Sequence, residues 1–528
     1  MPNGFQEASS RRDFLCSAGA ALLGAPAILK ASPGPPNILI LMTDQQRSDA
    51  LGCYGLRSTG TPNLDRLAAE GALFENCYIN NPICTPSRAS MLTGKSLPGH
   101  GVYKLYDNLP DDQVLFPKRL QQEGYRTALF GKLHVSGRLY EAARRHPQDG
   151  FDVYEWCLEP SIHLDSPFNA YARWLAEQDP VFLARLKAEG RKLLHTPRNL
   201  HMTHWAAERT IDFIRRSDRK QPFFCLMSIF DPHNPYDGYP LEMEKLVDRA
   251  KIPEPLPAGA IGQKPYGIRY EHEHSYLGAF RKFSREDLRT MRSGYYAAIA
   301  LADLEMGRVL AALQEKGIAD NTLVIFTSDH GDMLGDHGLL VKGAFFYEAC
   351  TKVPLLMRWP GRIRGGVRLR QLAQLNDLAA TVLTAAGCLS DAARSQMPES
   401  RDLLPACAGQ ADKIHEYAIC SYRNSGIFDT GAYADPAIHA TMLRDGRYKL
   451  NVYHAPAGAS GGAEGELYDM EADPDESVNL WNQPGHSHIR GRMTESLLAW
   501  LAAQDVRSGS RGGEMVPPPS QKLTNPVR

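Results

Sequence analysis

The run Asn321-Thr322-Leu323-Val324-Ile325-Phe326-Thr327 is followed at once by Ser328-Asp329-His330-Gly331-Asp332. The first part is apolar without alternation, which is typical of a strand that is covered on both faces of a sheet. The second part supplies acidic and imidazole groups where that strand ends. Further apolar runs of strand length occupy residues 37–43, 125–130, 222–230 and 353–358.

Helical patterns alternate with these strands, at residues 62–68, 116–123, 202–215 and 284–316. We therefore predict an α/β fold with a large central sheet, mostly parallel or mixed, flanked by helices. Polar motifs follow the strands, and ligands bind at the carboxyl ends of strands in open α/β sheets. Residues 141–200 are predicted as a helical insertion, and residues 236–280 as a long excursion over the site.

The pattern changes near residue 390. Short alternating runs at 439–444 and 448–452 flank Asp445-Gly446, which is a hairpin signal, and a helix is expected at about 490–502. The predicted organisation is a catalytic α/β domain at 36–390 and a smaller C-terminal α+β subdomain at 391–508, which carries an antiparallel sheet. A loose tail follows at 509–528.

Residues 1–31 are predicted to be an export signal. Ser10-Arg11-Arg12-Asp13-Phe14-Leu15 precedes a small and apolar run at 16–29, as in twin-arginine signals; an ordinary disordered leader is the alternative. The run is too short and too rich in Ala and Gly for a stable membrane anchor. Export places the mature protein in a bacterial periplasm or outside the cell.

The composition excludes some functions. Lys and Arg number 59 against 60 Asp and Glu, so no basic excess indicates a nucleic-acid partner. The ten cysteines form no C-x-x-C pair, which argues against a zinc ribbon or a thioredoxin-like site.

One cysteine lies in a distinctive motif, Cys84-Thr85-Pro86-Ser87-Arg88, between a predicted turn at 80–82 and a predicted helix at 87–92. A lone cysteine is usually a buried structural thiol. This motif, continued by Thr93-Gly94, resembles that of the type I sulfatases of the alkaline phosphatase superfamily. The resemblance implies that a formylglycine-generating enzyme oxidises Cys84 to formylglycine (3-oxoalanine) before folding and export, and that the aldehyde hydrate attacks the sulfate sulfur.

The same resemblance implies one divalent cation, held by Asp44, Gln45, Asp329, His330 and an oxygen of the converted Cys84. A lone Asp44 would be read as a turn or cap residue. Oxygen-rich ligation favours Ca²⁺, with Mn²⁺ or Mg²⁺ as alternatives. Gln45 stands where many members of the family carry Asp, and His330 where many carry Asn. Both residues resemble the phosphonate monoester hydrolase branch.

Arg88 lies four residues after Cys84 and is expected on the same helix face, where it can hold the hydrate. Lys132 and His134 alternate in a segment predicted to be extended, so their side chains point the same way. By resemblance, Lys132 binds sulfate oxygens and His134 assists the collapse of the hemiacetal.

By the same resemblance, His233 in Asp-Pro-His-Asn-Pro is the general acid, with a pKa near neutrality. Lys342 is a second sulfate-binding lysine. Each basic residue alone would be read as a solvated surface charge.

Three functions are consistent with the sequence. The first is a sulfatase that acts on a sulfated sugar or polymer, with arylsulfates as model substrates. The second is a phosphonate monoester or phosphodiester hydrolase on the same site. The third is a non-enzymatic binding protein with Cys84 unmodified.

Overall fold

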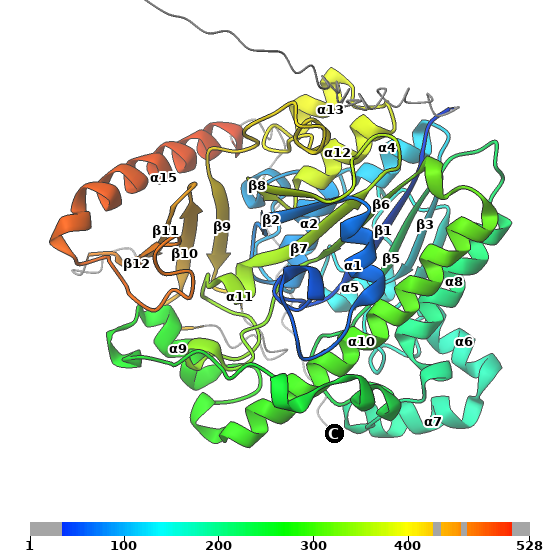
Figure 1. Cartoon of the computed structure of the whole chain (residues 1–528), viewed down its shortest axis with the longest axis horizontal. Helices are drawn as coiled ribbons and strands as arrows, with labels where there is room; N and C mark the ends of the chain where they lie inside the picture. Colours follow the sequence, from blue (N-terminus) through cyan, green and yellow to red (C-terminus); the bar gives the residue numbers. More distant parts are fainter. Residues whose placement is uncertain (1–33, 426–433, 456–461, 509–528) are drawn as a thin grey trace, which may run out of the picture. The chain divides into compact units, whose positions relative to one another are not determined.

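The predicted apolar runs are strands of one eight-stranded mixed sheet in the computed structural model, which describes residues 34–425, 434–455 and 462–508. The strands are β1 (Asn37–Thr43), β2 (Ala72–Tyr78), β3 (Arg126–Gly131), β4 (Val153–Trp156), β5 (Phe223–Ser228), β6 (Thr322–Ser328), β7 (Lys352–Arg358) and β8 (Val367–Gln374). The order is β4-β3-β5-β1-β6-β7-β2-β8. Only β7 is antiparallel to its neighbours in this sheet (Figure 1). The predicted α/β fold is confirmed.

Alternate residues of β1 enter two different cores. Ile38 and Ile40 belong to the apolar cluster on one face of the sheet, and Leu39 and Leu41 belong to the cluster on the other face. The first face is covered by α2 (Cys84–Thr93), α4 (Phe116–Gln122) and α12 (Asp377–Ala385), and the second by α1 (Pro62–Ala69), α8 (Met202–Arg216) and α10 (Arg285–Lys316). Burial on both faces explains why the strand shows no alternation.

Two long insertions interrupt the sheet. The first insertion, residues 132–201, contains α5 (Arg138–Ala143), α6 (Ala170–Gln178) and α7 (Pro180–Glu189), as predicted, but also the unpredicted edge strand β4. The second insertion, residues 229–284, consists of loops, short 3-10 turns and α9 (Tyr266–His274). The remaining short helices are α3 (Leu97–His100), α11 (Glu348–Thr351), α13 (Asp391–Gln396) and α14 (Leu404–Cys407).

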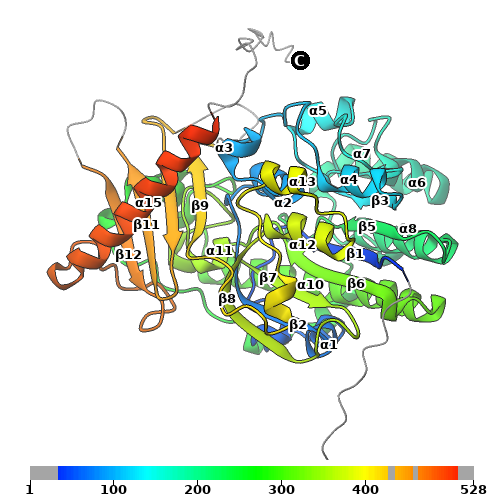
Figure 2. The ribbon, with the colours of Figure 1, turned by 90° about the horizontal axis from the view of Figure 1, so that it is seen from above.

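A second, four-stranded antiparallel sheet follows, in the order β12-β11-β10-β9. Its strands are β9 (Ala418–Arg423), β10 (His439–Arg444), β11 (Tyr448–His454) and β12 (Glu464–Asp469). The predicted hairpin at Asp445-Gly446 joins β10 to β11. The helix α15 (Ser487–Ser508) packs across this sheet through Met493 and Leu497 (Figure 2).

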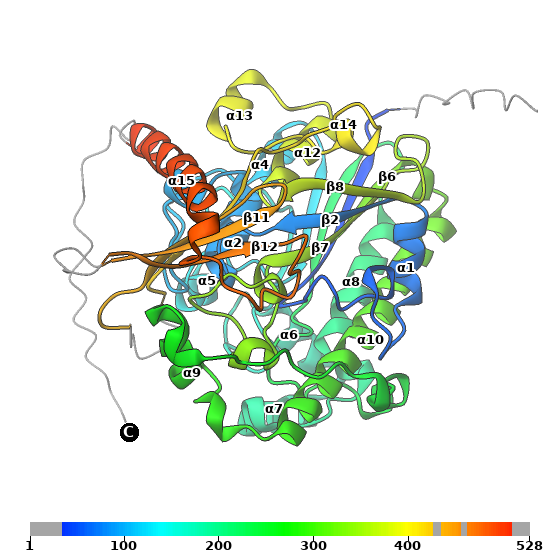
Figure 3. The same ribbon diagram turned by 60° about the vertical axis from the view of Figure 1, so that its left-hand side comes forward.

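The two sheets are joined by direct hydrogen bonds. Gln374 Nε2 donates to the carbonyl of Ile419 at 2.8 Å, and Asn81 Nδ2 donates to the carbonyl of Ser421 at 2.7 Å. In Figure 3, α15 lies above strands β11 and β12 of the second sheet. The boundary at residue 390 stays a prediction, and the predicted export signal and tail lie outside the described residues. Within those residues, no helix combines the length and apolar character that crossing a bilayer requires.

Candidate active site

Cys84 is the first residue of α2, and its side chain is buried. The turn before it is held by Asn81, whose Oδ1 accepts from the backbone N–H of Ile83 at 2.7 Å. Ser87 Oγ anchors the first turn of α2 to the carbonyl of Asp329 at 2.6 Å. The helix start therefore lies against the end of β6, and its positive end is directed at the Cys84 side chain.

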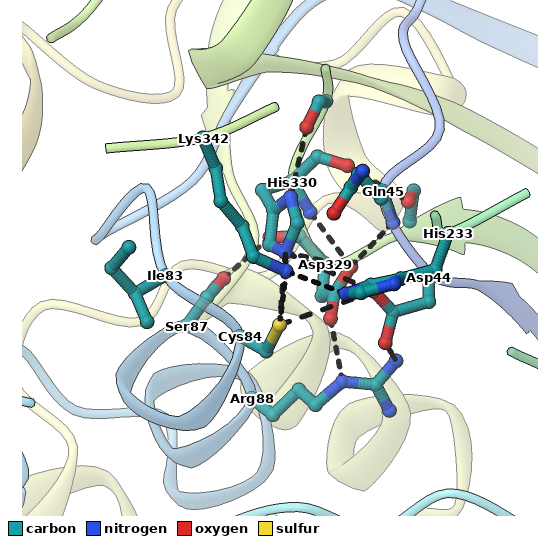
Figure 4. Close-up of polar contacts among 12 residues, drawn as sticks. Asp44, Gln45, Ile83, Cys84, Ser87, Arg88, His233, Asp329, His330 and Lys342 are labelled. Carbon is teal, nitrogen blue, oxygen red and sulfur yellow. Dashed lines mark hydrogen bonds and ion pairs between the residues drawn. The ribbon is translucent and has the colours of Figure 1, made fainter. Parts of the chain in front are cut away.

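Asp44 and Asp329 meet because β1 and β6 are parallel and in register, with Thr43 opposite Ser328. The residue after each strand therefore reaches the same edge of the sheet. Ligand atoms of Asp44, Cys84, Asp329 and His330 all lie within 4.8 Å of one another (Figure 4).

Arg88 balances the two carboxylates. Its Nε donates to Asp329 Oδ2 at 2.6 Å, and a terminal nitrogen donates to Asp44 Oδ2 at 3.1 Å. The other terminal nitrogen donates to Ser228 Oγ at 2.9 Å. Arg88 shares the helix face of Cys84, as its spacing predicts. A buried arginine with satisfied donors is the arrangement that a pair of buried carboxylates requires.

Two lysines approach the cysteine from other elements. Lys132, just after β3, forms an ion pair with Asp44. Lys342 Nζ lies 2.8 Å from Cys84 Sγ and 2.9 Å from His233 Nε2, and His330 Nε2 lies 3.1 Å from the same sulfur. The sulfur position is thus surrounded by cationic and polar nitrogens (Figure 4).

These charges control protonation. Burial raises the pKa of Asp44, but Lys132, His233, Arg88 and Lys342 together outweigh it and hold that pKa well below its usual range. Burial and Asp44 raise the pKa of the Cys84 thiol, but the two lysines and His330 together lower it below the ordinary value. The site therefore favours an anion at the position of the sulfur.

The predicted near-neutral pKa of His233 is wrong for this site. Burial and the adjacent Lys342 lower the pKa of His233 well below its ordinary value, although Asp44 opposes them. His233 Nδ1 lies 2.6 Å from the carbonyl oxygen of Asn234, which leaves Nε2 facing Lys342. The neutral His233 Nε2 can therefore accept a hydrogen bond from Lys342 Nζ.

The extended backbone predicted for Lys132-Leu133-His134 is also wrong, because His134 is in the left-handed region with φ 56°. Both side chains nevertheless line one cavity. His134 Nε2 lies 3.1 Å from Thr85 Oγ1, while burial and Lys132 lower the pKa of His134 well below its ordinary value. The ring is thus a neutral group beside the cysteine helix.

Sequence reasoning missed Glu141, which fixes this turn. Its buried carboxylate accepts from the backbone N–H groups of His134, Val135 and Ser136 at 2.9, 2.7 and 3.2 Å, and from Trp156 Nε1 at 3.0 Å. Nothing in the local sequence distinguishes Glu141 from a surface glutamate on α5.

The donor set fits a divalent cation. Gln45 Nε2 donates to Asp332 Oδ2 at 2.6 Å, and its Oε1 is buried without a hydrogen-bond partner among the described residues. A buried amide oxygen without a partner is costly unless something binds it. Together with Asp44, Asp329 and His330 it gives the mainly oxygen ligation that hard cations prefer.

A cavity of about 310 Å³ opens in front of this cluster. Cys84, Lys132, His134, His233 and Lys342 line it. Buried Asp44 and Asp329 lie behind the cysteine, so cationic and polar side chains face the cavity while the carboxylates face inward. This arrangement suits an anionic substrate presented to the Cys84 position.

Such a sheet edge, with a buried cysteine on a helix start and a group of possible cation ligands, is compatible with a hydrolase of anionic esters. The chain matches the family model for sulfatases over residues 36–388, and the C-terminal model of N-sulphoglucosamine sulphohydrolase over residues 335–503. The protein belongs to the sulfatase family and is a sulfuric ester hydrolase.

Individual relatives support the assignment to the sulfatase family. An arylsulfatase from Clostridium perfringens is 30% identical over 85% of this chain and 90% of its own length. An N-acetylglucosamine-6-O-sulfatase from Bacteroides thetaiotaomicron is 28% identical over 88% of this chain and 85% of its own length. Among solved structures, the phosphonate monoester hydrolase of Agrobacterium radiobacter has the same fold, with a TM-score of 0.73 and 23% sequence identity. The match covers 89% of this chain and 96% of that protein.

Proposed function

We propose that the protein hydrolyses sulfate esters of a sulfated carbohydrate, with arylsulfates as model substrates, through a formylglycine at position 84. The observation that carries this proposal is the surroundings of buried Cys84. Two lysines, Lys132 and Lys342, border a cavity in front of it, and the cation-binding cluster lies behind it. An anionic sulfate placed there is neutralised from both sides.

Asp44, Gln45, Asp329 and His330 would hold the cation together with an oxygen of residue 84. We propose Ca²⁺, with Mn²⁺ or Mg²⁺ as alternatives, because oxygen ligands predominate. When bound, the cation supplies Lewis-acid stabilisation of negative charge on oxygen.

Conversion of Cys84 to formylglycine would supply a hydrate with one hydroxyl to bond to sulfur and a second to expel sulfate afterwards. Lys132 and Lys342 bind the sulfate oxygens. The leaving alcohol takes its proton from the pair formed by Lys342 Nζ and His233 Nε2. His134 sits beside Thr85 on the α2 start, where its neutral ring can accept a proton from the residue 84 hydrate.

Two observations support a carbohydrate substrate. One is the activity named for the Bacteroides relative, an N-acetylglucosamine-6-O-sulfatase. The other is the predicted twin-arginine signal, which would deliver the enzyme to the periplasm or the medium, where sulfated polysaccharides occur. A formylglycine-generating enzyme is the proposed maturation partner.

A phosphonate monoester or phosphodiester hydrolase is the second candidate. His330, whose Nε2 lies 3.1 Å from Cys84 Sγ, and Gln45 depart from the commonest sulfatase pattern. The likeness to a phosphonate monoester hydrolase supports only the shared fold.

The test compares kcat/KM for matched aryl sulfate and aryl phosphonate monoesters on the purified enzyme, alongside mass spectrometry of the peptide containing Cys84. We expect sulfate to be preferred and the peptide to show sulfur lost and oxygen gained. A preference for phosphonate of about a thousandfold, or 4 kcal/mol, would replace the first candidate by the second. An active enzyme with an unmodified thiol would overturn the proposed nucleophile.

A further inference from the structure

A contact between the two insertions forms one side of the active-site cavity. Glu159 follows β4 and Arg191 follows α7 in the first insertion, while Tyr276 belongs to the second insertion. All three side chains line the cavity in front of Cys84. They are separated by 32 and 85 residues along the chain.

The contact is made through every nitrogen of the guanidinium. Arg191 Nε donates to Glu159 Oε1 at 2.9 Å, one terminal nitrogen pairs with Glu159 Oε2, and the other bonds to Tyr276 Oη. The Glu159 side chain is only 7% exposed. The Arg191 side chain is 35% exposed, so the pair lies at the cavity surface, and its bidentate geometry adds strength and orientational specificity over a single-contact ion pair. We call Glu159, Arg191 and Tyr276 the wall cluster.

The wall cluster is internally neutralised. Because the charge of Arg191 is balanced by Glu159, this part of the wall offers little attraction to a second anionic group. The remaining lining contains the apolar Leu105, Leu158 and Ile162 together with Tyr106 and Arg138. The cluster therefore acts as a barrier that joins two insertions rather than as a second anion site.

The cavity is small. Its volume of about 310 Å³ lies at the lower end of the roughly 300–1,000 Å³ range of small-molecule pockets. That space accommodates one ring with its sulfate. A ring inside a polymer has a chain leaving on both sides and needs a groove open at two ends, whereas a terminal ring needs only one opening.

From this geometry we infer that the site removes sulfate from a terminal ring only, and that the wall cluster excludes rings with chain on both sides. The inference rests on the proposed sulfatase function and deepens it, since it assigns exo rather than endo action. It also makes Glu159, Arg191 and Tyr276 specificity-determining residues of this chain.

The test uses two aryl sulfates that differ only in their chains. One carries a single oligo(ethylene glycol) chain and mimics a terminal ring; the other carries two chains on opposite sides and mimics an internal ring. Sulfate release is measured by ion chromatography, with 4-nitrophenyl sulfate as the reference. We expect kcat/KM of the wild-type enzyme to be about 100-fold higher for the one-chain probe, because the second chain collides with the wall.

Two variants examine the wall itself. Arg191→Ala removes the whole contact, and Tyr276→Phe removes only the bond to the second insertion while it leaves the Arg191–Glu159 pair intact. We expect the preference for the one-chain probe to fall about 10-fold or more in both. Arg185→Ala is the matched control, because Arg185 lies on α7 in an exposed pair with Glu189 at 2.7 Å; its preference should equal that of the wild type.

Equal wild-type rates on the two probes would overturn the inference while leaving the proposed function intact, provided that 4-nitrophenyl sulfate is hydrolysed. An unchanged preference in folded Tyr276→Phe and Arg191→Ala would show that the wall cluster does not set it. No sulfate release from any of the three esters would instead refute the proposed function itself.

Discussion

Glu141 holds His134 in its left-handed backbone conformation, since the carboxylate accepts the His134 N–H at 2.9 Å. This conformation is sterically unfavourable for a histidine, so the surrounding hydrogen bonds must offset its free-energy cost. The carboxylate also binds the next two N–H groups of the turn. Glu141 is thus a positioning residue for the side of the cavity that carries His134.

Glu141→Ala should therefore weaken both the fold and the turn. Loss of the acceptor leaves buried N–H groups unpaired, which should lower the free energy of unfolding by about 3 kcal/mol. We expect kcat to fall about 10-fold or more through misplacement of His134. Urea unfolding and steady-state kinetics measure the two effects.

A double-mutant cycle separates positioning from general destabilisation. If Glu141 acts through His134, the activity losses of Glu141→Ala and His134→Ala should not add in the double variant. Fully additive losses at a temperature where all variants are folded would contradict this role.

Cys84→Ala should fold and be exported but be inactive, because it removes the buried side chain proposed to become the nucleophile and to give the cation one oxygen ligand. Cys84→Ser should be nearly as inactive, since a simple hydroxyl can form a sulfate ester but cannot eliminate it. Thermal melting confirms the fold, and release of 4-nitrophenol from its sulfate measures activity. Wild-type turnover by Cys84→Ala would rule out residue 84 as the nucleophile.

Asp44→Ala and Asp329→Ala should each abolish activity and lower the bound metal. Either change removes a carboxylate while Arg88 and Lys132 keep their positive charges, so cation affinity should fall about 100-fold or more. Metal per protein is measured by inductively coupled plasma mass spectrometry after dialysis. Asp111→Ala, an exposed partner of Arg144, is the control. Full metal occupancy in both site variants would show that the cluster is not the metal site.

Glu305 should make folding sensitive to acid. Its burial alone would raise the pKa, but hydrogen bonds from His204, Arg308 and Arg198 outweigh it and lower the pKa of Glu305 to about 2. A depressed pKa contributes stability that is present above the unfolded value near 4.5 and is lost as the pH falls toward 2. The full contribution at neutral pH is about 3 kcal/mol.

Glu305→Gln is the corresponding variant. The difference in unfolding free energy from the wild type should be about 2 kcal/mol smaller at pH 3 than at pH 7, as measured by urea titration. A difference that does not change between these two pH values would mean that the Glu305 charge is not what stabilises this cluster.

The centre of the fold could be predicted from the sequence because burial on two faces leaves an unmistakable pattern. The apolar runs of β1 and β6 end in Asp44 and Asp329, and parallel strands bring such ends to one edge. β4 was missed because it is short and only its Trp156 is buried. β2 was missed because Glu75 and Asn76 interrupt its apolar run.

The side-chain geometry around the site could not be predicted in the same way. The φ of His134 is set by Glu141 seven residues later, and the wall cluster includes a bond between Arg191 and Tyr276, which are 85 positions apart. The pKa of His233 depends on Lys342, which is 109 residues away. Contacts of this kind depend on the tertiary structure of the insertions, so they cannot be predicted from the periodicity of the local sequence.

The pairing of β1 with β6 also sets the order in which the chain can assemble. The central strand cannot gain this neighbour until residue 328 has been synthesised, roughly 240 residues after Cys84. At about 5–20 residues per second, translation keeps this edge of the sheet incomplete for some 10 to 50 s. During that interval the thiol that folding will bury is still on an open, unfinished chain. Contacts between residues far apart in sequence, which slow folding, would thus give the proposed formylglycine-generating enzyme time to act.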